Sequence, residues 1–295
     1  MPESPSLVHL FVGATLSATS VGITARVLRD LGAAQSREGQ IILGAAVVDD
    51  VLGLVVLAVA SGAVTGAAAG VPGLSILGVA GILVRAILFL AITVGLGHLL
   101  SGPIVRLAAR TGQHGILLVV GLALCFSLAF AAELVGLADI IGAFAAGLML
   151  DPYGEGLRAR PEEATVSELM HPLSSLFVPL FFVLMGLQVH LASLLSPAIL
   201  VLGAALILCA VAGKLVCGLV AFGWGVNRLA VGIGMVPRGE VGLIFAGIGA
   251  GLSFRGQPVL SQGAFSALVL MVLVTTLLAP VGLRWAFGRR LPATG

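Results

Sequence analysis

Residues 39–63 read GQIILGAAVVDDVLGLVVLAVASGA, an apolar run that is long enough to span a bilayer and carries two adjacent aspartates near its centre. Ionisable groups inside a bilayer are costly, so Asp49 and Asp50 mark a functional site by default. Successive residues on a helix point about 100° apart. The two carboxylates therefore face different neighbours, and we expect them to have different roles.

The rest of the chain shares this composition. Hydrophobic residues make up 59% of the 295 residues and charged residues only 9%, whereas a soluble domain carries about 25% charged residues. A chain this poor in charge needs lipid as its solvent, and in lipid the backbone must form helices or a closed barrel. Long apolar runs rich in Ala, Leu and Gly, in place of short alternating strands, predict helices. The net charge of +2 is too small to indicate a nucleic-acid partner, and no motif calls for a cofactor.

The apolar runs predict an all-α polytopic membrane protein, with about nine transmembrane helices in one domain that covers residues 1–295 and lies in the lipid bilayer. The fifth expected span is short. The expected spans are 6–28, 39–63, 74–101, 113–135, 137–151, 168–191, 195–223, 228–252 and 260–287.

Arginines lie mainly in the loops on one side of these spans. A cytoplasmic C-terminus places the loops 29–38, 102–112, 152–167 and 224–228 on the cytoplasmic side. Together with the C-terminal tail, they carry Arg29, Arg37, Arg106, Arg110, Arg158, Arg160, Arg228, Arg284, Arg289 and Arg290. The opposite loops hold only Arg255, which is the asymmetry of the positive-inside rule. We therefore expect a multi-pass protein of the cell inner (plasma) membrane with its C-terminus in the cytoplasm.

A lysine lies in the middle of the expected helix 195–223. Lys214 stands at the depth where an ammonium group is most costly, so it needs an acidic partner, and an aspartate is the obvious one. A lysine also changes its protonation when it is desolvated, which an arginine effectively does not. An inert ion pair is the alternative reading of this residue.

Two of the expected helices carry interruptions. In the stretch GIGMVPRGEVGLIF (232–245), Pro237 removes a backbone hydrogen bond, Gly239 loosens the next turn, and Arg238 and Glu240 add charge. The first helix contains a polar cluster within GATLSATSVGITARV (13–27), namely Ser17, Thr19, Ser20 and Gly22. Serine and threonine alone are also common at helix contacts. Two broken helices together with two buried acids, however, indicate the ion site of a transporter.

At this point the sequence resembles a known family, the bacterial sodium/proton antiporters of the monovalent cation:proton antiporter-2 group, which are relatives of the potassium-efflux exchangers. The resemblance rests on LSATSVGITARVL (16–28), ILGAAVVDDVLGLVVLAV (42–59), DIIGAFAAGLML (139–150), PLFFVLMGLQVHL (179–191), AGKLVCG (212–218) and MVPRGEVGLIFAGIG (235–249). These segments cover nearly the whole chain, and the double aspartate is quite specific.

The resemblance implies a role for each charged residue at midplane. Asp50 would be the carboxylate that carries the proton and transiently binds the metal ion Na⁺, and Asp49 would pair with Lys214. Two adjacent acids are the pattern of the family's electrogenic members, whereas electroneutral members carry Asn then Asp.

The resemblance also assigns the residues at the two breaks. Thr19 and Ser20 would line the first broken helix and contribute to ion and proton binding. Glu240 would lie beside the second broken helix, and Arg238 would join it and Lys214 in a group of salt-bridge and coupling residues.

The family's architecture implies how the chain is divided. Helices within about 6–63 and 195–287 would form a core domain in which the two broken helices cross, and helices within about 74–191 would lie between them. The chain begins at what looks like the family's first broken helix, so we expect that the leading helices are absent and that the inverted repeat is incomplete. The full-length family implies a homodimer.

Taken together, these observations predict electrogenic sodium/proton antiport by alternating access, with the ion and the proton competing for buried Asp50. A potassium/proton exchanger or efflux system of the same fold remains an alternative, as does an inactive truncated remnant. An intramembrane aspartyl protease is disfavoured because it needs two carboxylates that converge on one water, whereas Asp49 and Asp50 diverge on one helix. We therefore expect a secondary transporter and not an enzyme.

Overall fold

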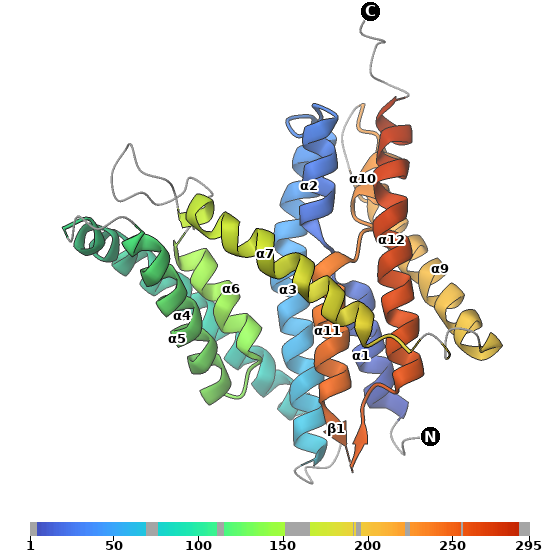
Figure 1. The fold of residues 1–295 in the computed structure, drawn as a ribbon, viewed down its shortest axis with the longest axis horizontal. Helices are drawn as coiled ribbons and strands as arrows, with labels where there is room; N and C mark the ends of the chain where they lie inside the picture. Colours follow the sequence, from blue (N-terminus) through green and yellow to red (C-terminus); the bar gives the residue numbers. More distant parts are fainter. Residues whose placement is uncertain are drawn as a thin grey trace, which may run out of the picture. The chain divides into compact units, whose positions relative to one another are not determined.

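The computed structural model is almost entirely helical (Figure 1) and describes residues 5–68, 76–110, 115–150, 166–190, 192, 196–221, 225–254 and 256–288. The N-terminal helices are α1 (Pro5–Ser17), α2 (Val21–Asp30) and α3 (Arg37–Ala68). The central helices are α4 (Ile76–Arg110), α5 (Ile116–Leu134), α6 (Asp139–Leu150) and α7 (Val166–Leu187). The C-terminal part contains α9 (Pro197–Leu219), α10 (Arg228–Gly234), α11 (Gly239–Gly251), a small antiparallel hairpin of β1 (Ser253–Phe254) and β2 (Gln257–Pro258), and α12 (Gln262–Gly288).

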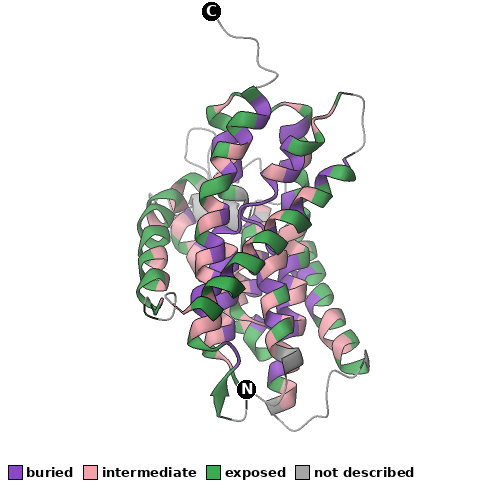
Figure 2. Ribbon diagram, turned by 90° about the vertical axis from the view of Figure 1, so that its right-hand side faces the viewer, coloured by how far each residue is buried: buried purple, intermediate pink, exposed green. Residues whose placement is uncertain are grey.

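The helices have the length and composition of membrane spans. In the described part of the chain, seven helices are long and apolar enough to cross a bilayer, and α10 and α11 together form one further candidate, bent by 43°. Many large apolar residues are exposed, among them Val47, Leu208 and Leu277. Figure 2 shows exposed residues of all kinds in green along the helices. Lipid is the solvent that such surfaces require. The expected all-α polytopic class is therefore confirmed, while the count of nine spans stays a prediction because α6 has only 12 residues.

Contacts divide the chain into two compact units, residues 1–60 with 182–295 and residues 61–181. The expected division into core helices and intervening helices stays a prediction, as does the orientation of the C-terminus. Several arginines that carry the orientation argument lie outside the described residues, namely Arg158, Arg160, Arg255, Arg289 and Arg290.

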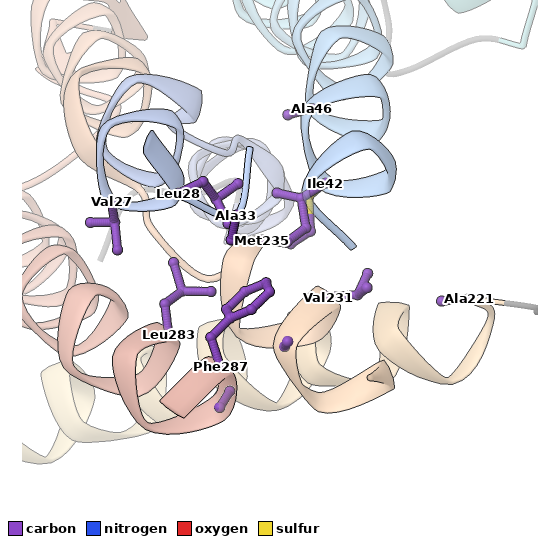
Figure 3. Close-up of a cluster of buried hydrophobic side chains, with 12 residues drawn as sticks. Val27, Leu28, Ala33, Ile42, Ala46, Ala221, Val231, Met235, Leu283 and Phe287 are labelled. Carbon is purple, nitrogen blue, oxygen red and sulfur yellow. The ribbon is translucent and has the colours of Figure 1, made fainter. Parts of the chain in front are cut away.

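A cluster of buried apolar side chains joins four helices of the first unit (Figure 3). It contains Val27 and Leu28 of α2, Ile42 and Ala46 of α3, Val231 of α10, and Leu283 and Phe287 of α12. The short helices α2 and α10 have too few residues to be stable alone, so packing of this kind must hold them in place.

Glycines allow α9 and α10 to approach each other closely. A β-carbon at Gly218 would overlap the backbone carbonyl of Arg228, and one at Gly232 would press on the backbone of Leu215. Small residues of this kind let helix backbones meet inside a membrane. Because α9 carries Lys214, this contact places the lysine next to the second broken helix.

The second unit consists mainly of α4, α5 and α6. A β-carbon at Gly142 of α6 would overlap the backbone of Leu128 in α5, so glycine is required for the close contact between these helices. Leu117, Leu150 and Val166 form a small buried cluster. None of the residues expected to bind an ion lies in this unit.

Candidate functional site

The structure pairs Lys214 with Asp49. The Nζ atom of Lys214 donates hydrogen bonds to both carboxylate oxygens of Asp49, at 3.1 and 3.2 Å. Lys214 is 8% exposed. The buried residues of α9 are Gly203, Leu206, Ala210, Lys214 and Gly218, which recur every three or four residues. This spacing puts the lysine on the packed face of its helix, turned away from lipid.

Asp50, the next residue of α3, has a different environment. Its side chain is half-buried. Within the described ranges it has no hydrogen bond and no ion pair. Asp50 is thus an acid without a counter-ion, in contrast to its neighbour.

The two interrupted helices meet at their interruptions. The first interrupted helix ends at Ser17 (α1) and resumes at Val21 (α2). The second ends at Gly234 (α10) and resumes at Gly239 (α11). The backbone N–H of Ser20 donates a hydrogen bond to the carbonyl oxygen of Pro237 at 2.8 Å. Irregular backbone at membrane depth needs such partners, because lipid offers none.

Two further features hold this junction together. The hydroxyl of Thr24 on α2 donates a hydrogen bond to the carbonyl oxygen of Gly234, the last residue of α10, at 2.7 Å. Gly239 has a φ of +26°, and a β-carbon there would overlap the side chain of Ser20. The second break therefore requires glycine both for its conformation and for its distance from the first break.

Arg238 contacts backbone carbonyls. It is 2% exposed, and its Nη atoms donate to the carbonyl oxygens of Ser17 (3.2 Å), Ala18 (2.6 Å) and Ala210 (3.2 Å). The last carbonyls of a helix have no partner within the helix, and the guanidinium supplies one at the C-terminal end of α1. The sequence had suggested a salt-bridge role, but none of these three hydrogen bonds reaches a carboxylate.

Glu240 lies in the first turn of α11. Its Oε2 atom accepts a hydrogen bond from the hydroxyl of Ser20 at 2.7 Å. Thr19, the residue before Ser20, is 1% exposed, and its hydroxyl has no hydrogen-bond partner in the described structure. The structure thus brings residues from both breaks and from α3 and α9 into one unit.

The arrangement separates two kinds of charge. The positive charge of Lys214 is matched by Asp49, and Arg238 is surrounded by carbonyls. The carboxylates of Asp50 and Glu240 have no cationic partner among the described residues. The hydrogen bonds that tie the breaks together could not be predicted from the sequence, because they use backbone acceptors, which every residue has.

The chain is similar to known proteins over nearly its whole length. The profile of the transmembrane sodium/hydrogen exchanger family matches residues 1–288. The chain is 41% identical to the high-affinity Na⁺/H⁺ antiporter NhaS3 of Synechocystis over 286 residues, which is 94% of this chain. It is 33% identical to the Na⁺/H⁺-K⁺ antiporter GerN of Bacillus cereus over 95% of this chain, and 30% identical to a Na⁺/H⁺ antiporter of Enterococcus hirae over 94%.

The chain spans only part of these relatives. It covers 58% of the Synechocystis protein and 68% of each of the other two.

Proposed function

Because this chain belongs to the transmembrane sodium/hydrogen exchanger family, we propose that it exchanges a monovalent cation for protons across a membrane as a secondary transporter, not an enzyme. The observation that carries the proposal is the contrast between two adjacent acids. Asp49 is neutralised by Lys214 at 3.1 Å. Asp50 has no hydrogen bond or ion pair in the part of the chain that the structure describes.

Asp50 is the residue at which the cation and the proton compete. Desolvation disfavours the charged form of a carboxylate, so a buried acid without a counter-ion tends to bind a proton or a cation. One carboxylate cannot hold both, so the binding of one releases the other, and this competition couples the two fluxes. Movement of the unit that carries the site would expose it to each side of the membrane in turn.

The electrogenic form of this exchange requires a second charge-handling group. Asp49 keeps its negative charge while it is paired with Lys214. If sodium displaces the lysine from Asp49, the freed ammonium can release its proton. The pair then contributes a second proton per cycle, which gives a net movement of charge.

Sodium is the first candidate for the cation. The Synechocystis and Enterococcus relatives are named as Na⁺/H⁺ antiporters. The second candidate is potassium, which the name of the Bacillus cereus relative includes.

The protein is a multi-pass membrane protein, and we place it in the plasma membrane with a cytoplasmic C-terminus. The core domain of the proposed transporter comprises the helices within 6–63 and 195–287. Its functional assembly is a homodimer.

The test uses everted membrane vesicles from cells that lack their own antiporters. Sodium or potassium is added to acidified vesicles, and proton release is followed by the dequenching of a pH-sensitive dye. Wild-type protein is expected to respond, and Asp50→Asn is expected to abolish the response. The matched control is Asp30→Asn, the same substitution at an exposed acid of the same unit. Wild-type rates in Asp50→Asn would end the assignment.

A further inference from the structure

Exposed arginines flank the contact between α2 and α12. Val27 and Leu28 of α2 belong to the same buried cluster as Leu283 and Phe287 of α12 (Figure 3). Three of the residues adjacent to these in the chain are exposed arginines, which therefore lie at a similar level along the two packed helices. They are Arg26, Arg29 and Arg284, and we call them the arginine face.

The positive charge of the arginine face is not matched by acids of the chain. Within the described residues, no ion pair involves Arg26, Arg29 or Arg284. The Nε atom of Arg29 donates to the carbonyl oxygen of Ala25 in its own helix, at 3.4 Å, which leaves its charge in place. One exposed acid, Asp30, ends α2, so one negative charge stands beside three positive ones. Such an excess attracts an anionic partner.

The neighbours of Arg284 on α12 show where this face lies relative to the bilayer. Val281 and Leu277, about one and two turns before it, are 68% and 63% exposed, and such side chains need lipid tails as their solvent. Arg284 follows Val281 by only about 4.5 Å along the helix axis. Trp285 is 49% exposed, and tryptophan is enriched at the boundary between tails and headgroups. The arginine face therefore lies at the level of the lipid headgroups.

We propose that the arginine face binds the headgroups of anionic phospholipids. Guanidinium groups donate paired hydrogen bonds to phosphate oxygens, and basic side chains beside a bilayer attract anionic lipids. A soluble acidic partner fits less well, because the exposed apolar residues directly beneath Arg284 have to stay in lipid.

This binding would act on the first broken helix. With ten residues, α2 is too short to be stable alone. Its inner end is the first break, and Arg26 and Arg29 lie toward its outer end. Headgroups bound to these two arginines would hold that outer end in place.

A tryptophan next to the arginine face serves as the reporter. The chain has two tryptophans, and Trp224→Phe leaves only Trp285. This variant of the full chain is reconstituted into phosphatidylcholine vesicles with a rising share of brominated phosphatidylglycerol or brominated phosphatidylcholine, and bromine quenches the fluorescence of a nearby tryptophan. We expect the anionic lipid to be preferred at Trp285 by at least about fivefold, the contribution of one arginine near an anionic surface.

Variants in the same background identify the residues that cause the preference. Arg26→Gln, Arg29→Gln and Arg284→Gln combined should reduce it to about equal binding of the two lipids. The corresponding three lysine substitutions keep the charge and should keep most of the preference. The matched control is Arg85→Gln, the same substitution at an exposed arginine of α4 in the second unit, and it should leave the preference unchanged.

Equal quenching by the two lipids in Trp224→Phe, or a preference that survives the three glutamines, overturns the inference. Binding of polyglutamate, a soluble polyanion, without any preference for the anionic lipid overturns it in favour of a soluble acidic partner. Folding is checked by circular dichroism. If the triple glutamine variant does not fold, Arg284→Gln decides, because its preference should fall severalfold and an unchanged preference overturns the inference.

Melting temperature gives a second measurement that needs no tryptophan substitution. Phosphatidylglycerol added to detergent micelles should raise the melting temperature of the wild type by more than that of the triple glutamine variant, or of Arg284→Gln if the triple variant does not fold. An equal rise in the two proteins overturns the inference.

Discussion

The backbone N–H of Ser20 donates a hydrogen bond to the carbonyl oxygen of Pro237 at 2.8 Å, and this bond joins the break in the first helix to the break in the second. The helix is interrupted between Gly234 and Gly239, so the carbonyl of Pro237, a residue that has no N–H of its own, is left without a helical partner. The freed carbonyl finds a donor in the other interrupted segment. Each break thus supplies part of the hydrogen bonding that the other lacks.

The hydroxyl of Thr24 strengthens this junction, which leads to a first prediction. Thr24→Val keeps the shape of the side chain but leaves the carbonyl of Gly234 without its donor. An unsatisfied buried acceptor costs about 1–3 kcal/mol, so we expect Thr24→Val to lower the melting temperature in detergent by several degrees, as followed by circular dichroism. Thr24→Ser keeps the hydroxyl and should melt close to the wild type. Equal melting of Thr24→Val and wild type would show that this bond contributes nothing.

The ion pair of Asp49 and Lys214 gives a second prediction. Removing one partner of a buried ion pair costs about 3–5 kcal/mol. The loss here should fall near the lower end, since the side chain of Asp49 is 22% exposed. Lys214→Gln should therefore destabilise the protein or reduce the voltage dependence of transport, with a smaller effect on sodium binding.

A double variant distinguishes the pair from the lysine alone. Asp49→Asn combined with Lys214→Gln removes both charges and leaves two amides that can bond to each other. If the two groups interact, the double variant should melt above Lys214→Gln, and the coupling energy from the cycle should exceed about 0.5 kcal/mol. If the stability losses of the two single variants simply add in the double variant, the two groups do not interact. Unchanged stability and transport current in Lys214→Gln would also argue against the ion pair.

The charged residues Asp49, Asp50 and Lys214 were also the part of the site that was easiest to predict from the sequence. An acid or a lysine within an apolar run is conspicuous, because the bilayer makes it costly. The long apolar runs likewise predicted the helical class. The pairing partner of Lys214 followed from charge alone, since Asp49 and Asp50 were the acids at a similar depth. Which of the two would pair came only from the family resemblance.

The contacts between the breaks could not be predicted in this way. Pro237 and Gly239 indicated where a helix would be interrupted, but nothing indicated that the carbonyl of Pro237 would face Ser20. The salt-bridge role of Arg238 stays a prediction, but the hydrogen bonds of this residue show the same limit. A buried arginine in a sequence suggests an acidic partner. The hydrogen bonds of Arg238 go instead to backbone carbonyls, which cannot be recognised from the sequence.

The glycine at the second break gives a third prediction. Gly239→Ala would place a β-carbon in the space of the Ser20 side chain, at a φ of +26°. Strain and overpacking each cost about 1–3 kcal/mol, so this variant should melt several degrees lower and lose transport. The matched control is Gly44→Ala on α3, where a β-carbon meets nothing within 4 Å and φ is not positive. A Gly239→Ala protein as stable and active as Gly44→Ala would refute the close contact.

Arg238 gives the last prediction, which concerns the shape of the guanidinium and not its charge. Its Nη atoms reach three carbonyl oxygens, those of Ser17 at the end of α1, of Ala18 directly after it, and of Ala210 on α9. Lysine keeps the positive charge but places its donors on one nitrogen at the end of a flexible stem, so it cannot match this planar fork. Each hydrogen bond to a charged group is worth about 1.5–3 kcal/mol. Arg238→Lys should therefore cost about 2 kcal/mol or more and lower the melting temperature.

The same substitution at Arg228, which is exposed at the start of α10, is the control and should leave stability unchanged. If Arg238 acts only as a positive charge near Asp49, then Arg238→Lys will match the control. If it holds α1 and α9 together at the first break, then Arg238→Lys will have a lower melting temperature than the control, although its net charge is unchanged. Melting curves of the two variants, recorded side by side in the same detergent, decide between these two roles.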